Sequence, residues 1–119
     1  MPSKHPALTF GDIIENIDRI RSYAAAKTQA EFFADQMLID ATERCLSRIS
    51  EAAVKLASQA EEFAPEIGWK DIRGIGNHLR HDYRGVNLRA IWQVVCEDLA
   101  PLRAACVAAR RKLAGEHEE

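Results

Sequence analysis

The densest group of side chains that could do chemistry lies in residues 76–83, Gly-Asn-His-Leu-Arg-His-Asp-Tyr. On a helix, Arg73, Asn77 and His81 stand at i, i+4 and i+8 and share one face, with Arg80 on its flank. A histidine with a pKa near neutrality can act as general base or general acid. An arginine can hold a phosphate and stabilise the charge that builds up on it, and an asparagine can orient either group. This set of residues could therefore cleave RNA without a metal ion.

Other interpretations of this cluster stay open. Arginine and histidine side chains gathered on a helix more often form a solvated polar face than a site. His78 and His81 form a His-x-x-His pair next to Asp82, but zinc usually takes three or four ligands, so we expect no metal site. The chain carries no glycine-rich phosphate loop and no dinucleotide fingerprint, so we expect no cofactor.

The elements that must position the cluster are predicted to be helices. An apolar repeat predicts a helix over residues 12–27; its members are Ile13, Ile17, Ile20 and Ala24. Thr28 and Glu31 have the spacing of a capping box for the next helix. A longer apolar stripe predicts one helix that reaches about Phe63, with a short separate turn around residues 32–33 as an option.

A third helix is predicted to begin near Trp69 and to carry the cluster, although Gly74 and Gly76 each weaken a helix by about 1 kcal/mol relative to alanine. A turn at residue 85 and an N-cap at Asn87 should precede a fourth helix, which Pro101 kinks or restarts. Residues 116–119 are expected to be a frayed tail.

These elements together predict an all-α fold, an antiparallel bundle of four to five helices formed by one domain over residues 1–119. No strand-like alternation and no hairpin turn signal appears in the chain. Hydrophobic residues make up 47 % of the sequence, which argues against disorder. The net charge of −2 means that any RNA contact must use a local patch of the surface.

The three cysteines, Cys45, Cys96 and Cys106, include no Cys-x-x-Cys pair. An odd number of cysteines suits a reducing compartment, and the simplest expectation is that all three are buried as small apolar residues. No apolar run approaches the length needed to cross a bilayer, and the first residues lack the apolar stretch of a signal peptide. The sequence therefore predicts a cytoplasmic protein without a membrane partner.

The chain resembles the HepT-like branch of the HEPN superfamily, which comprises ribonuclease toxins paired with minimal nucleotidyltransferase antitoxins. The resemblance covers nearly the whole chain and is fairly specific, because several independent landmarks occur in the same order. They are residues 69–77 (Trp-Lys-Asp-Ile-Arg-Gly-Ile-Gly-Asn), residues 81–83 (His-Asp-Tyr), residues 85–87 (Gly-Val-Asn), residues 91–92 (Ile-Trp) and residues 98–102 (Asp-Leu-Ala-Pro-Leu).

The family's catalytic pattern is an arginine, a short spacer, and then His-x-Tyr. His81 and Tyr83 match this pattern, but Gly76 stands where the family usually has its arginine, so Arg73 and Arg80 are the two candidates to replace it. The resemblance implies a homodimeric helical bundle in which two His-bearing helices face each other and form an RNA groove.

The resemblance also implies that a nucleotidyltransferase antitoxin partner adds AMP to Tyr83. Phosphate charge added there would repel RNA from the Arg/His pair and inactivate the enzyme. The alternative is a catalytically weakened or inactive relative, which would bind a nucleotide or a protein on the same fold. The departure at Gly76 is the feature that favours this alternative.

Overall fold

The computed structural model describes residues 3–81 and 88–118, and it describes only the backbone at residues 77, 78, 80, 81 and 116–118. The described residues form helices and the turns between them, with no strand, which confirms the predicted all-α class. The elements are α1 (Pro6–Tyr23), α2 (Gln29–Ala34), α3 (Gln36–Leu56), α4 (Ser58–Phe63), α5 (Trp69–His81), α6 (Leu88–Gln93), a short π-helix η1 (Val94–Asp98) and α7 (Leu99–Glu118).

Helix α1 starts and ends earlier than the prediction of residues 12–27. It begins at Pro6, a residue whose ring fixes φ near the helical value and whose missing N–H is not needed in a first turn. It ends at Tyr23, and the following residues form a turn in which Ala26 has a φ of 60°. The apolar repeat located the buried face correctly, because Ile13, Ile17 and Ile20 are fully buried.

The capping box is confirmed. The Glu31 amide donates to the Thr28 hydroxyl at 3.1 Å, and the Thr28 amide donates to the Glu31 carboxylate at 2.9 Å. The short helix α2 that follows corresponds to the separate turn that the sequence allowed. Asp35 then caps α3 by accepting a hydrogen bond from the Leu38 amide at 3.0 Å.

The prediction of one helix that continues to Phe63 is wrong. Helix α3 ends at Leu56, because Ala57 adopts a φ of 50° and a ψ of −131°, and helix α4 starts at the next residue. This conformation interrupts the α-helical hydrogen-bond ladder and is costly for a residue that has a Cβ atom. Apolar spacing alone could not reveal the break, because Ala60 is also fully buried.

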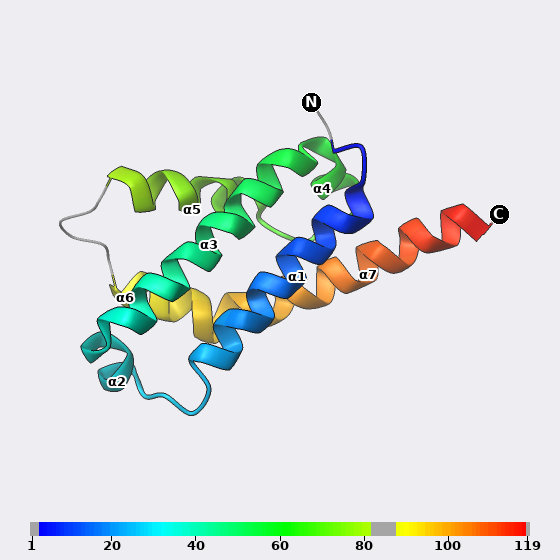
Figure 1. Cartoon of the computed structure of the whole chain (residues 1–119). Helices are drawn as coiled ribbons and strands as arrows, with labels where there is room; N and C mark the ends of the chain where they lie inside the picture. The colour runs from blue at the N-terminus through cyan, green and yellow to red at the C-terminus, as the bar shows by residue number, and fades with distance from the viewer. Residues whose placement is uncertain (1–2, 82–87, 119) are drawn as a thin grey trace.

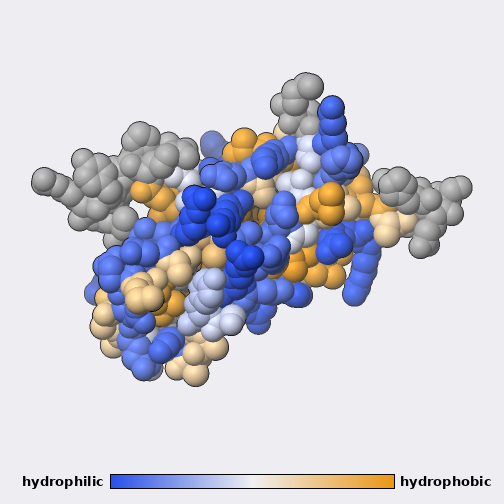
Figure 2. All heavy atoms as spheres, in the orientation of Figure 1, coloured by the Kyte–Doolittle hydropathy of each residue, from blue (hydrophilic) through white to orange (hydrophobic). Residues whose placement is uncertain are grey.

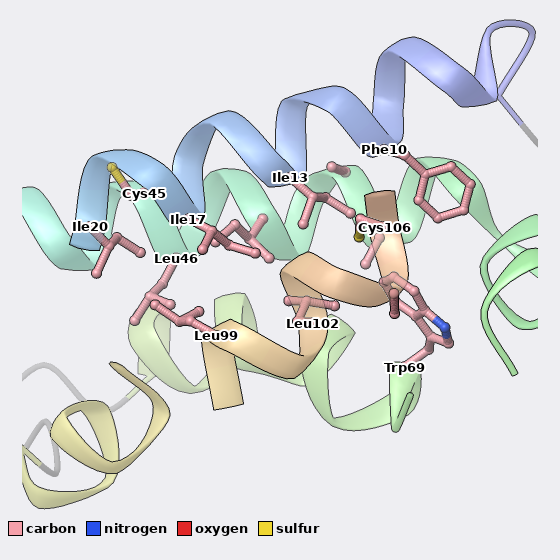
Figure 3. Packing of buried hydrophobic residues seen from close by; sticks show 14 of the residues in the cluster. Phe10, Ile13, Ile17, Ile20, Cys45, Leu46, Trp69, Leu99, Leu102 and Cys106 are labelled. Carbon is pink, nitrogen blue, oxygen red and sulfur yellow. The ribbon is translucent and has the colours of Figure 1, made fainter. Parts of the chain in front are cut away.

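The core lies between α1, α3 and α7, which Figure 1 shows running alongside one another with alternating chain direction. Figure 3 shows apolar side chains of these three helices meeting in a common interior, together with Trp69 at one end. The guanidinium of Arg103 on α7 holds Asp18 on α1 in two hydrogen bonds of 2.7 and 3.1 Å. Helix α5 packs on another side of α3.

The irregularity that Pro101 was predicted to cause in the fourth helix lies just before that residue, at η1. Pro101 has no N–H to donate to the carbonyl of Glu97, and the preceding turn widens into η1, in which the Leu99 amide donates to the Val94 carbonyl. Helix α7 then continues to Glu118, into the segment expected to be frayed. The predicted turn at residue 85 and N-cap at Asn87 lie outside the described residues.

Both tryptophans are structural anchors: Trp69 is buried, and Trp92 packs on Phe32 with a centroid separation of 5.1 Å. The expectation for the cysteines is correct for Cys45 and Cys106, which are buried, and wrong for Cys96, which is exposed on η1.

Candidate functional site

The helix that carries the predicted site, α5, is anchored at its first residue. Trp69 is 1 % exposed, and its indole nitrogen donates to the Ala64 carbonyl at 2.8 Å. Its ring meets Phe10 of α1 edge to face at a centroid distance of 6.3 Å. In the first turn, the negative charge of Asp71 is favourable near the positive end of the helix dipole. The start of α5 is therefore fixed in both position and direction.

One turn further on, Arg73 is directed back onto the end of α3. Its guanidinium donates to the Ala53 carbonyl at 3.3 Å, to the Ala57 carbonyl at 2.7 Å and to the two carboxylate oxygens of Glu61 at 3.0 and 2.6 Å. These bonds use four of the five N–H donors of an arginine. The hydrogen bond from Arg73 also lowers the pKa of Glu61. Arg73 thus joins α5 to the interrupted junction of α3 and α4.

The same turn of α5 is bound to α3 by the hydroxyl of Ser50. This hydroxyl donates to the Arg73 carbonyl at 2.9 Å and accepts from the Gly76 amide at 3.1 Å. Both Ser50 and Gly76 are buried. Gly76 is therefore a buried residue at the contact between α5 and α3, and its amide is bonded directly to the Ser50 hydroxyl. At Gly74, on the same helix, an added Cβ would meet nothing within 4 Å.

The other predicted site residues lie beyond this contact. Asn77, Arg80 and His81 belong to the last turns of α5, and His81 is its final residue. At 1.5 Å per residue, His81 lies about 12 Å along the helix axis from Arg73. Tyr83 lies outside the described residues. The structure thus places the backbone of Asn77, Arg80 and His81 together at one end of α5, and it directs the Arg73 guanidinium to the α3–α4 junction.

Two grooves that are lined by described residues adjoin α3, and neither is predominantly basic. The first, of about 320 Å³, lies between α5, α7 and η1; its floor is apolar, and its charged lining residues are all acidic (Glu66, Asp71 and Asp98). Such a rim repels phosphate. The second, of about 390 Å³, lies between α1 and α3, where hydrophilic side chains gather in Figure 2. Its charged residues are balanced (Arg19, Arg48 and Lys55 against Asp12, Glu15 and Glu51).

Among the described side chains, no group of three histidine, cysteine or acidic residues is placed to hold a metal ion. Within residues 3–81 and 88–118, no helix is both long enough and apolar enough to cross a membrane.

Comparison with known proteins gives the family. The family model "Ribonuclease HepT-like" matches residues 13–109, which include all of α3 and α5. The chain belongs to the HepT-like ribonuclease family. A candidate ribonuclease HepT of Thermococcus cleftensis is 30 % identical over 92 residues, which cover 77 % of this chain and 84 % of that protein. No solved structure matches the chain.

Relatives also occur in Methanocaldococcus jannaschii. One candidate RNase is 27 % identical over 103 residues, which cover 87 % of this chain and 85 % of that protein. Another protein, named as a gamma-glutamylcyclotransferase and candidate RNase, is 34 % identical over 91 residues. The match spans 76 % of this chain but 41 % of that longer protein. The HepT-like chain thus corresponds to most of some relatives and to a part of another.

Sequence reasoning about this HepT-like protein missed Ser50 and Glu61. Ser50 follows Ile49 and is itself buried on α3. The sequence signal that could have revealed it is a polar residue at the edge of an apolar stripe that faces a helix containing glycines. Glu61 carried no such signal. Its carboxylate reaches Arg73 because the chain changes direction at Ala57, and the sequence did not predict that break.

Proposed function

We propose that this HepT-like protein is a metal-independent endoribonuclease and the toxin of a toxin–antitoxin pair. The observation that carries the proposal is the family match across α5, the helix that ends at His81. In this proposal, His81 is the general base that removes the proton of a ribose 2′-hydroxyl, or the general acid that protonates the leaving 5′-oxygen. Attack of the 2′-oxygen on the adjacent phosphorus then yields a 2′,3′-cyclic phosphate.

Arg80 is the arginine proposed to hold the scissile phosphate. Arg73, the other candidate, already uses four donors within the protein, and a phosphate would have to displace Glu61 and two carbonyl groups to bind it. Arg80 immediately precedes His81, so both residues belong to the same turn of α5. Asn77, one turn earlier, is proposed to orient the phosphate or the histidine.

The test is cleavage of single-stranded RNA by the purified protein in the presence of EDTA. We expect products with 2′,3′-cyclic phosphate ends and no cleavage of an all-deoxy analogue. We expect His81→Ala to abolish cleavage, whereas the control His5→Ala, changed at an exposed position ahead of α1, should retain it. Cleavage by His81→Ala at the wild-type rate would overturn the assignment.

The proposed regulation is AMP addition to Tyr83 by a nucleotidyltransferase antitoxin. Negative charge beside the Arg/His pair would repel the RNA backbone. When the protein is incubated with a nucleotidyltransferase encoded beside it and with ATP, we expect the mass of AMP to be added and RNA cleavage to stop. A Tyr83→Phe protein that is modified equally well would contradict this assignment.

The proposed assembly is a homodimer in which the α5 helices of two copies face each other and form the RNA groove. Ile72 and Ile75 of α5 line an apolar groove and are only partly buried within one chain. Burial of these side chains against a second copy would favour the proposed dimer. Sedimentation velocity at micromolar concentration should show a dimer, and a monomer under these conditions would contradict the proposal.

A second candidate function is a non-catalytic binding module. Its supporting observation is that Gly76, at the family's arginine position, is buried and bonded to Ser50 rather than presenting a guanidinium. This alternative predicts no RNA cleavage together with intact binding to the nucleotidyltransferase partner. The EDTA assay and size-exclusion mixing with that partner, performed on the same preparation, separate the two functions.

A further inference from the structure

Beyond its first residue, Trp69, which is anchored by Ala64 and Phe10, helix α5 has one main neighbour, α3. Among the described elements, α3 is the one against which α5 packs most extensively, and a groove lies between α5 and the neighbouring η1 and α7. Ile72 and Ile75 are only partly buried, so apolar packing at this surface is incomplete. Apolar contacts are also non-directional, and they tolerate a small rotation or slip of a helix more readily than hydrogen bonds do.

Among the described residues, the hydrogen bonds between α3 and α5 converge on a single turn of α5, residues 73–76. Ser50 is 3 % exposed, and its hydroxyl both donates to the Arg73 carbonyl and accepts from the Gly76 amide. A serine within a helix commonly bonds to the carbonyl of its own preceding turn. Here the Ser50 hydroxyl is instead bonded to α5, where the Arg73 carbonyl accepts from it and the Gly76 amide donates to it. Both of these backbone groups belong to one turn of α5.

The buried glycine distinguishes this register from its neighbours. A slip of α5 by one residue would move its backbone by about 1.5 Å along the axis and turn it by about 100°. The Ser50 hydroxyl would then face a different residue, and the buried glycine would be replaced by a neighbour with a side chain, Ile75 or Asn77. The Arg73 guanidinium adds an independent tie to α3 through Ala53 and Ala57.

We propose that Ser50 is a positioning residue that sets the rotation and axial register of α5 and thereby the placement of His81. This inference rests on the proposed function of His81. The Ser50–Gly76 contact lies about 7.5 Å along the axis from His81, so an error at this turn is carried directly to the end of the helix. A displacement of about 1 Å in a reacting group can cost about 100-fold in rate.

The test compares Ser50→Ala and Ser50→Thr with Ser47→Ala. Ser47 lies on the same helix and is half-buried, and its side chain makes no hydrogen bond with any described residue, so it is a matched control. Two measurements are made on each variant: hydrogen exchange of the Gly76 amide by NMR, and kcat and KM for RNA cleavage in EDTA.

We expect Ser50→Ala to speed exchange of the Gly76 amide and to lower kcat about 10- to 100-fold with little change in KM. Ser50→Thr, which keeps the hydroxyl, should restore much of kcat, and Ser47→Ala should resemble the wild type. The pH optimum should stay in place, because the variant displaces His81 without changing the charges around it. Wild-type Gly76 exchange in Ser50→Ala, or an unchanged kcat, would overturn the proposal.

Failure of the proposed function has a different result, in which the wild-type protein itself cleaves no RNA. The positioning of α5 is then decided by NMR alone. Ser50→Ala should shift the amide resonances of α5 from Gly76 to His81, whereas Ser47→Ala should leave them in place. If the resonances through His81 are unaffected in a folded Ser50→Ala protein, the positioning role is wrong.

Discussion

The hydrogen bonds of Arg73 lead to a quantitative prediction about stability. Arg73→Ala removes bonds to the Ala53 and Ala57 carbonyls and to Glu61. A hydrogen bond to a charged group contributes about 1.5–3 kcal/mol net when it is well formed and shielded. The Ala53 bond is long at 3.3 Å, and the Arg73 side chain is 25 % exposed, so water recovers part of the loss. We therefore expect the free energy of unfolding to fall by about 2–3 kcal/mol.

The assay is urea unfolding followed by circular dichroism, with three comparison variants. Arg73→Lys keeps the charge but cannot form the forked contacts, so its loss should be intermediate. Glu61→Gln should have a clearly smaller effect than Arg73→Ala, because Glu61 is exposed and both carbonyl bonds remain. Arg19→Ala removes an exposed pair with Glu15 within one helix and should cost about 0.3–0.5 kcal/mol.

Two outcomes would refute this reasoning. If Arg73→Ala loses no more stability than Arg19→Ala, the carbonyl bonds do not hold α5 to the α3–α4 junction. If Arg73→Ala is as stable as the wild type and yet loses RNA cleavage, Arg73 is the phosphate-binding arginine and its contact with Glu61 opens when RNA binds. Measuring unfolding and cleavage on the same variants distinguishes these cases.

The remaining predictions concern two backbone positions, the reactivity of the cysteines and the loss of stability at low pH. Gly74→Ala should raise the free energy of unfolding by about 0.5–1 kcal/mol in urea titrations, because a methyl group fits there without contact and alanine favours the helix; a loss of stability would contradict this. Ala57→Gly should be stabilising by about 1 kcal/mol in the same assay, because glycine tolerates a φ of 50°. A thiol reagent at mildly alkaline pH should modify exposed Cys96 first, because burial raises the pKa of Cys106 to about 12; equal rates would contradict this. The hydrogen bond from Arg103 on α7 lowers the pKa of Asp18 in the folded protein. The stabilisation from this ion pair is therefore fully present above pH 3.8, the ordinary pKa of the carboxyl group, and is lost as the pH falls through the lower pKa of the folded state. Asp18→Asn should flatten this part of the curve of stability against pH.

Local chemistry along the chain was sufficient to predict the helices that carry the core. The isoleucine repeat identified the buried face of α1, and the spacing of Thr28 and Glu31 identified the start of α2. Trp69 and the repeat that follows it located α5. These features are set by contacts within one or two turns, so the periodicity of side chains is enough to reveal them.

The same local rules failed where a residue's conformation is decided by distant partners. The break at Ala57 was missed because its neighbours continue the apolar stripe, and its carbonyl is bonded by Arg73 of another helix. Helical spacing placed Arg73 on the face of His81, but a long side chain can turn toward any neighbour within reach, and here it binds Glu61.

The sequence by itself determined the helical class, most of the buried faces and the family whose pattern ends in His81 and Tyr83. The tertiary structure showed that the Arg73 guanidinium is bonded to Ala57 and Glu61, and it revealed that Ser50 binds the turn of α5 that precedes the predicted site. The physical reason is that hydrogen bonds between helices depend on register and crossing geometry, which emerge only when α3 and α5 pack together.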